Sequence, residues 1–177
     1  MSTHSRILTF IACLVASALE PAASQPSAAF DIVPGRVGAI VIGMSVDDFY
    51  LKVGRDRTRL VDQFWEGLFD PAVEVRLSPK ASSPNLVAKV GASACGFTVG
   101  MVIVHDPRFR LASGIHVGSS FGELRRLHRV EISKDEGLRA YSTELHMAFE
   151  IDSVADAAKV REIWVSATPA SPTCSRK

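Results

Sequence analysis

The chain has 177 residues, of which 47% are hydrophobic and 22% charged, a balance that is typical of globular proteins and excludes general disorder. Lys and Arg number 20, Asp and Glu number 19, and the net charge is +1. This near-neutrality argues against a nucleic-acid-binding protein and against a protein held on anionic lipid by its charge. The length suits one domain, or two small repeats that share a core.

The N-terminal segment has the pattern of an export signal. Arg6 precedes an apolar run over residues 7–19, and small residues follow at 22–24. The run is shorter than the about 20 apolar residues that a bilayer span requires. We therefore predict a signal peptide over 1–24 and a flexible segment over 25–34, with a buried N-terminal helix as the alternative. The protein is then periplasmic or secreted, with no integral membrane segment in the mature chain.

Three cysteines are too few for a disulfide-built scaffold. Cys13 lies inside the apolar run and follows a poor lipoprotein motif at Phe10, so we interpret it as discarded with the signal peptide rather than lipidated. Cys95 and Cys174 remain, and two leftover cysteines in an oxidising compartment tend to pair. This disulfide would close a loop of about 80 residues and contribute roughly 4 kcal/mol. The alternative is a buried free Cys95 and a frayed C-terminus.

Each half of the chain contains a short strand, a glycine, a serine and then an acid. Asp48 follows Ser45 by three residues, and Glu123 follows Ser120 by the same spacing. This is the spacing of a helix capping box, in which the serine accepts a hydrogen bond from a free backbone N–H of the first turn. The sequence predicts two short capped helices that are stable only when packed on a sheet.

A second similarity supports an internal repeat. Glu66-Gly67-Leu68 recurs as Glu136-Gly137-Leu138, and alternating apolar residues typical of strands follow in both halves. We predict an α+β fold in which tandem repeats over 35–104 and 111–166 each pack a short helix on antiparallel strands. Residues 35–177 would form one domain with a C-terminal tail.

The segment Ile42-Gly43-Met44-Ser45, with Asp48, resembles a Gly-Met-Thr turn of small bacterial envelope proteins. This turn occurs in the BamE/SmpA-like outer-membrane assembly factors and in the β-lactamase-inhibitory-protein-like group, and Val117-Gly118-Ser119-Ser120 is similar but lacks the methionine. The stretch Asp106-Pro107-Arg108-Phe109-Arg110 resembles uncharacterised exported bacterial proteins of similar length. These resemblances imply a fold, and a sheet face that binds another protein or a role in outer-membrane assembly.

The sequence provides little support for catalysis. No two histidines have the spacing of a zinc-binding helix and no Cys-x-x-Cys is present, so we expect neither a metal nor another cofactor. Adjacent strand residues point to opposite faces, which argues against orientation of His105 by Asp106. Glu66 and Glu136 occupy matching positions and are better explained as parts of turns than as paired catalytic carboxylates. We assign no catalytic residue.

Two candidate binding sites remain. Arg108 and Arg110 flank Phe109 in the joint between the halves, where two guanidinium groups could bind carboxylates or phosphates, although a solvated loop is the simpler explanation. Phe64 and Trp65 would form an interaction anchor if exposed. We favour their burial in the core of the first half.

Together these features predict an exported, non-enzymatic binding or interaction protein of the bacterial cell envelope. Its partner would be an envelope protein or a cell-wall component. The alternatives are a periplasmic hydrolase that uses His105 or His116 with a nearby acid, and an accessory protein of outer-membrane assembly.

Overall fold

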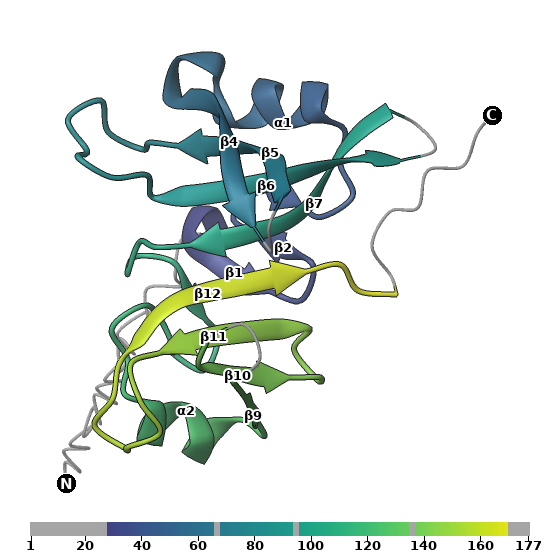
Figure 1. Cartoon of the computed structure of the whole chain (residues 1–177). Helices are drawn as coiled ribbons and strands as arrows, with labels where there is room; N and C mark the ends of the chain where they lie inside the picture. The colour runs from purple at the N-terminus through teal and green to yellow at the C-terminus, as the bar shows by residue number, and fades with distance from the viewer. Residues whose placement is uncertain (1–27, 66–67, 94–95, 135–136, 170–177) are drawn as a thin grey trace, which may run out of the picture.

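The computed structural model describes residues 28–65, 68–93, 96–134 and 137–169. Its largest feature is an eight-stranded antiparallel sheet of order β4-β5-β6-β7-β12-β11-β10-β9, in which β7 and β12 meet in the middle (Figure 1). Its strands are β4 (Thr58–Trp65), β5 (Leu68–Val75), β6 (Leu86–Ser93), β7 (Gly96–Val104), β9 (Glu131–Ser133), β10 (Arg139–Ser142), β11 (Met147–Ile151) and β12 (Val160–Ser166).

A second, small sheet lies behind the large one in Figure 1. Its order is β3-β2-β1-β8, from β1 (Asp31–Val33), β2 (Arg36–Val37), β3 (Ile40–Val41) and β8 (Arg110–Leu111). Gly38 makes its tight turn possible, because its φ is +53° and a Cβ there would lie 2.5 Å from the Ala29 carbonyl oxygen. Short 3₁₀ turns precede β1 and β4, at Ala28–Phe30 and Arg55–Arg57.

The main core lies between the large sheet and the elements behind it. Alternate residues of β5, β6, β7, β11 and β12 point into it, as the two-residue period of a strand requires. The helices α1 (Val46–Val53) and α2 (Phe121–Leu127) add Phe49, Phe121 and Leu124, and the small sheet adds Ile32 and Val37. One continuous core therefore ties both halves of the chain together.

The other face of the large sheet carries a second, smaller hydrophobic cluster, and we call it the open face. The cluster consists of Ala72, Val87, Ile103, Ala148 and Trp164, with Val61 and Met101 packed against it. All of these residues belong to strands of the sheet itself, so no described element adds to this cluster from outside.

Both helix caps form as predicted. The Ser45 hydroxyl accepts a hydrogen bond from the Asp48 backbone N–H at 3.1 Å and donates to the Asp48 carboxylate at 2.8 Å. The Ser120 hydroxyl accepts from the Glu123 backbone N–H at 3.2 Å. The local pattern was sufficient here because a cap depends only on residues within one turn.

The predicted fold class is wrong. The described protein is mostly β, with helices of only 8 and 7 residues, and it is not an α+β repeat of a helix on strands in each half. Strands of two or three residues, such as β1 and β2, are too short to show an alternating pattern, and the sheet that they form with β3 and β8 was not foreseen. Moreover, β1 starts inside the segment that we expected to be flexible.

Several predictions fall outside the described residues. These are the signal peptide over 1–24, the fate of Cys13, the Cys95–Cys174 disulfide and the turns at Glu66 and Glu136. Within the part that the structure does describe, no helix has the length and apolar character needed to cross a membrane.

Candidate functional site

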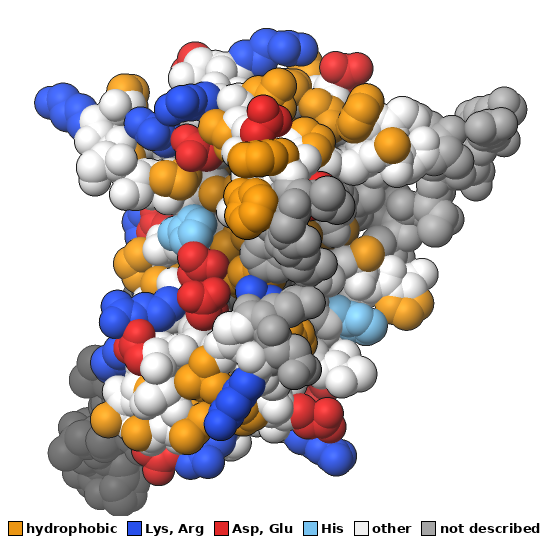
Figure 2. Space-filling view, in the orientation of Figure 1, with side chains coloured by type: hydrophobic (Ala, Val, Ile, Leu, Met, Phe, Trp, Pro, Cys, Tyr) orange, Lys and Arg blue, Asp and Glu red, His pale blue; other side chains and the backbone are white. Residues whose placement is uncertain are grey.

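The β4–β5 hairpin carries an exposed aromatic pair. Phe64 and Phe69 lie opposite each other in the register, their ring centroids are 5.3 Å apart, and they are 63% and 70% exposed. Leu60 lies on the same side of β4 and is 65% exposed. We call Leu60, Phe64 and Phe69 the hairpin patch. Hydrophobic side chains are visible around β4 and β5 in the upper part of Figure 2.

The strand pairing explains why these rings are exposed. β5 pairs with β4 along its whole length but with β6 only from Ala72 to Val75, so the tip of the hairpin is not paired with β6, which continues to Ser93 against β7. The expected burial of Phe64 is therefore wrong, and the Trp65 side chain is outside the described part of the structure. β4 is also an edge strand, whose outer backbone groups have no partner strand among the described residues.

A row of charged side chains crosses the centre of the open face. Glu162 on β12 lies opposite Glu150 on β11, which lies opposite Arg139 on β10. On the other side, His105 Nδ1 is 3.4 Å from Glu162 Oε1, and both side chains are half-buried. Figure 2 shows a histidine beside acidic side chains near the middle of this face. Three strands and the residue that directly follows β7 thus bring distant parts of the sequence into one row.

Trp164 connects this row to the hydrophobic cluster of the open face. Its indole Nε1 donates a hydrogen bond to Glu162 Oε2 at 2.9 Å. The guanidinium carbon of Arg139 lies 3.9 Å from the centroid of the indole ring, in cation–π contact. Glu162 is therefore held from two sides, by Trp164 and by His105.

The pKa of Glu150 is raised above its usual value of 4.5. Burial is the largest cause, because it disfavours the charged form, and the negative charge of Glu162 adds to the effect. The positive charges of Arg139 and His105 oppose the shift without cancelling it. The row thus combines a carboxyl that retains its proton more readily than usual with a histidine–glutamate contact, which is an arrangement able to transfer protons.

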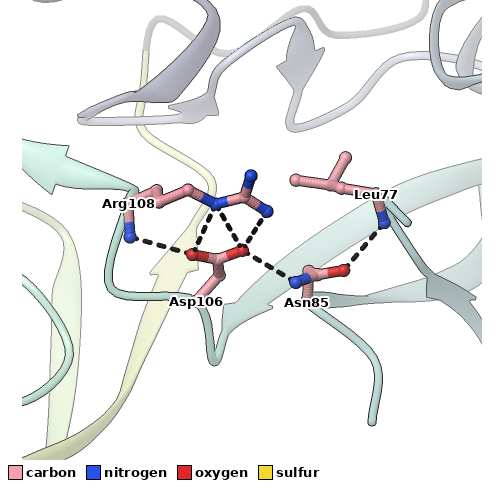
Figure 3. Close-up of polar contacts among 4 residues, drawn as sticks. All are labelled: Leu77, Asn85, Asp106 and Arg108. Carbon is pink, nitrogen blue, oxygen red and sulfur yellow. Dashed lines mark hydrogen bonds and ion pairs between the residues drawn. The ribbon is translucent and has the colours of Figure 1, made fainter. Parts of the chain in front are cut away.

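The joint between the halves of the chain is held by the buried carboxylate of Asp106, which is 5% exposed (Figure 3). Arg108 Nη2 donates to Asp106 Oδ2 at 2.7 Å, and the Arg108 backbone N–H donates to Oδ1 at 2.9 Å. Asn85 Nδ2 donates to Oδ2 at 2.7 Å, while its own Oδ1 accepts from the Leu77 backbone N–H at 2.7 Å. The Asp106 carboxylate is thus bound by Arg108 and Asn85, whereas the neighbouring His105 contacts Glu162.

The three predicted binding residues of this joint, Arg108, Phe109 and Arg110, do not form one exposed surface. The Arg108 guanidinium lies between Asp106 and the ring of Phe30, whose centroid is 5.2 Å away. Phe109 is buried and packs edge-on against Phe30 at 5.1 Å, whereas Arg110 is exposed on β8. Binding of a ligand by Arg108 and Arg110 stays a prediction, and the described contacts of Arg108 are internal.

Sequence reasoning missed the row on the open face and Phe69. Glu162 and Trp164 do alternate with buried residues along β12, and this alternation could have assigned them to one face. Nothing local indicates that Glu150 and His105 lie beside them, because that depends on strand order and register. The described residues contain no group of three or more His, Cys, Asp or Glu side chains placed to hold a metal ion.

Comparisons with known proteins give a fold but no activity. No protein-family model matches the chain. No curated protein matches it either. The structure is similar to the crystal structure of the uncharacterized protein YfeY from Escherichia coli, with a TM-score of 0.56 and 13% sequence identity. The similarity covers 76% of this chain and 99% of YfeY, so the two proteins share a fold across nearly all of the smaller chain.

Proposed function

We propose that this chain is an exported, non-enzymatic binding protein of the bacterial cell envelope, and that its hairpin patch docks an extended segment of another envelope protein. The observation that carries this proposal is the exposed Phe64–Phe69 pair on an edge hairpin. Large apolar side chains that gather on an exposed edge are a feature of interaction surfaces and of aggregation-prone segments.

The hairpin offers the two kinds of contact by which an incoming strand is added to a sheet, backbone hydrogen bonds and side-chain contacts. The outer edge of β4 offers backbone N–H and C=O groups to an incoming strand, and Leu60 and Phe64 offer apolar contacts on one side of it. Burial of one exposed phenylalanine side chain contributes about 1.5–3 kcal/mol. Two rings are enough to make the hairpin tip a binding anchor.

In-cell crosslinking tests the proposed docking. A photoreactive amino acid placed at Asp62, an exposed position between Leu60 and Phe64 on β4, should capture one dominant envelope protein. The Phe64→Ser/Phe69→Ser variant should lose this product. Leu51→Ser is the matched control, because Leu51 is equally apolar and highly exposed but lies on α1. Undiminished capture by the double variant would rule out the hairpin as the docking site.

Export and the identity of the partner need separate measurements. Cell fractionation with mass determination of the purified protein should show loss of residues 1–24, and palmitate labelling should leave Cys13 unlabelled. A chain that retains residues 1–24 in the cytoplasm would contradict the envelope role. Capture of an outer-membrane assembly protein would identify the chain as an accessory of that process.

The contact between His105 and Glu162 favours a second candidate function, a hydrolase. The Glu162 carboxylate contacts Nδ1 of the His105 imidazole. The other ring nitrogen, Nε2, is therefore the one placed to accept a proton from a water molecule. Purified protein would be assayed against chromogenic esters, amides and glycosides. Turnover that is lost in both His105→Ala and Glu162→Gln would establish catalysis, and absence of turnover on all three classes would exclude these hydrolase activities.

A further inference from the structure

A cavity of about 240 Å³ lies on the main-core side of the large sheet, between α1, the small sheet and the neighbouring edge of β5 and β6. Its walls are mainly apolar and include Phe30, Ile40, Val53, Leu77, Leu86 and Phe109. Neither the hairpin patch nor the charged row of the open face contributes to it. Pockets for drug-sized ligands start at about 300 Å³, so this one suits a smaller molecule.

Two cations line the same cavity. Lys52 comes from the last turn of α1, and Arg57 comes from the 3₁₀ turn that follows. Neither side chain has an ion pair or hydrogen bond with the described residues, and no acid lines the cavity there. The neighbouring Arg55 differs, because it contacts Asp47 at 4.0 Å and lies 4.5 Å from the Tyr50 ring centroid.

The network in Figure 3 holds two walls of the cavity in place. Asn85 binds the Leu77 backbone and the Asp106 carboxylate, each at 2.7 Å. The Asp106 carbonyl oxygen in turn accepts a hydrogen bond from the Phe109 backbone N–H at 3.2 Å. Leu77 and Phe109 are therefore fixed relative to each other before any ligand enters, and a preformed apolar pocket binds without a large ordering cost.

We propose that this cavity binds a medium-chain carboxylic acid of about eight carbons. The hydrocarbon tail would lie against Phe30, Leu77 and Phe109, and the carboxylate would pair with Lys52 and Arg57. The pocket is apolar, and its two cations have no ion pair among the described residues. It therefore fits both the tail and the head of an anionic amphiphile, since charge-assisted hydrogen bonds to a carboxylate are among the strongest that side chains form. This site is independent of the hairpin patch, so either proposal can fail without the other.

Calorimetric titration of the protein, purified from cells that express the full sequence, tests the proposal. Octanoate is the probe, octanol lacks its charge, and acetate lacks its tail. Octanoate should bind at least about tenfold more tightly than either, a difference of about 1.4 kcal/mol. Lys52→Gln/Arg57→Gln should abolish the preference for octanoate over octanol, whereas Arg55→Gln, the matched control, should leave it unchanged.

A blocking variant tests the location. Ala39 lines the cavity but is itself exposed, so Ala39→Trp can fill the entrance without disturbing the core. It should lose binding of octanoate and octanol alike, with an unchanged circular dichroism spectrum. Equal affinities for octanoate and octanol, full octanoate binding by Ala39→Trp, or binding only to phosphatidylglycerol vesicles would each overturn the proposal.

Discussion

The buried carboxylate of Asp106 shows how one residue can fix the joint between the halves of the chain to the first half. Burial alone would raise its pKa, but hydrogen bonds from Arg108 and Asn85 and the positive charge of Arg108 outweigh burial and lower the pKa below its usual 3.8. A carboxylate with a lowered pKa stabilises the folded state at pH values above its ordinary pKa. That contribution is lost as the pH falls through the lowered pKa.

Removal of this charge should therefore destabilise the protein. Asp106→Asn leaves a similar shape but a weaker acceptor for Arg108 and Asn85, and hydrogen bonds to charged groups are worth about 1.5–3 kcal/mol. We expect a loss of about 2 kcal/mol in urea unfolding at pH 7. Asp47→Asn is the control, because the Asp47–Arg55 contact is exposed and should cost under about 1 kcal/mol. Equal losses in the two variants would contradict the role of Asp106.

Glu150 should have the opposite pH dependence. Its pKa is raised in the folded state, so the stabilisation that it gives is present below its usual value of 4.5 and is lost as the pH rises through the raised pKa. Glu150→Gln should consequently have a higher urea midpoint than the parent at pH 7, and the difference should vanish in acid. The control variant Glu144→Gln, at an exposed position, should have the same urea midpoint as the parent both at pH 7 and in acid. A lower midpoint for Glu150→Gln at pH 7 would show that attraction to Arg139 dominates.

At the scale of elements, each helix begins at a serine whose hydroxyl replaces a missing backbone partner. Substitution of a capping serine by alanine costs about 1 kcal/mol. Ser45→Ala and Ser120→Ala should each lower the free energy of unfolding by about this amount, measured in urea. Ser45→Thr retains the hydroxyl and should lose much less. A Ser120→Ala variant as stable as its parent would mean that core contacts of Phe121 and Leu124 alone set the start of α2.

The sequence predicted structure that depends on neighbouring residues, but it did not predict structure that depends on strand pairing. The caps at Ser45 and Ser120 depend on neighbours within one helical turn, and both were predicted. The exposure of Phe64 was not, because it depends on where the pairing of β5 with β6 starts, at Ala72. The contact of His105 with Glu162 depends on the register of β7 against β12, which no local pattern records.

At the scale of the whole molecule, the β7–β12 pair is the contact that unites the two halves of the chain. It joins strands from the two halves of the chain into one sheet, and without it each half would have an exposed edge. The sequence predicted antiparallel strands in both halves but neither this pairing nor the small sheet. Pairing between strands distant in sequence is set by the packing of the whole core, in which residues of both halves are buried together.

The same arrangement predicts a gradient of stability across the large sheet. Val102, Ile103 and Trp164, on β7 and β12, are buried on the two faces of the sheet centre, and both strands are paired on both sides. Amide hydrogen exchange should therefore be slowest in β7 and β12, and fastest in the edge strands β4 and β9, whose amides open without global unfolding. Within β4, the amide of Phe64 should exchange faster than that of Leu60, since Leu60 lies opposite Val73, a residue that is also paired with β6. Uniform protection from β4 to β9 would mean that the hairpin tip is already covered, and that it is not free to receive a partner.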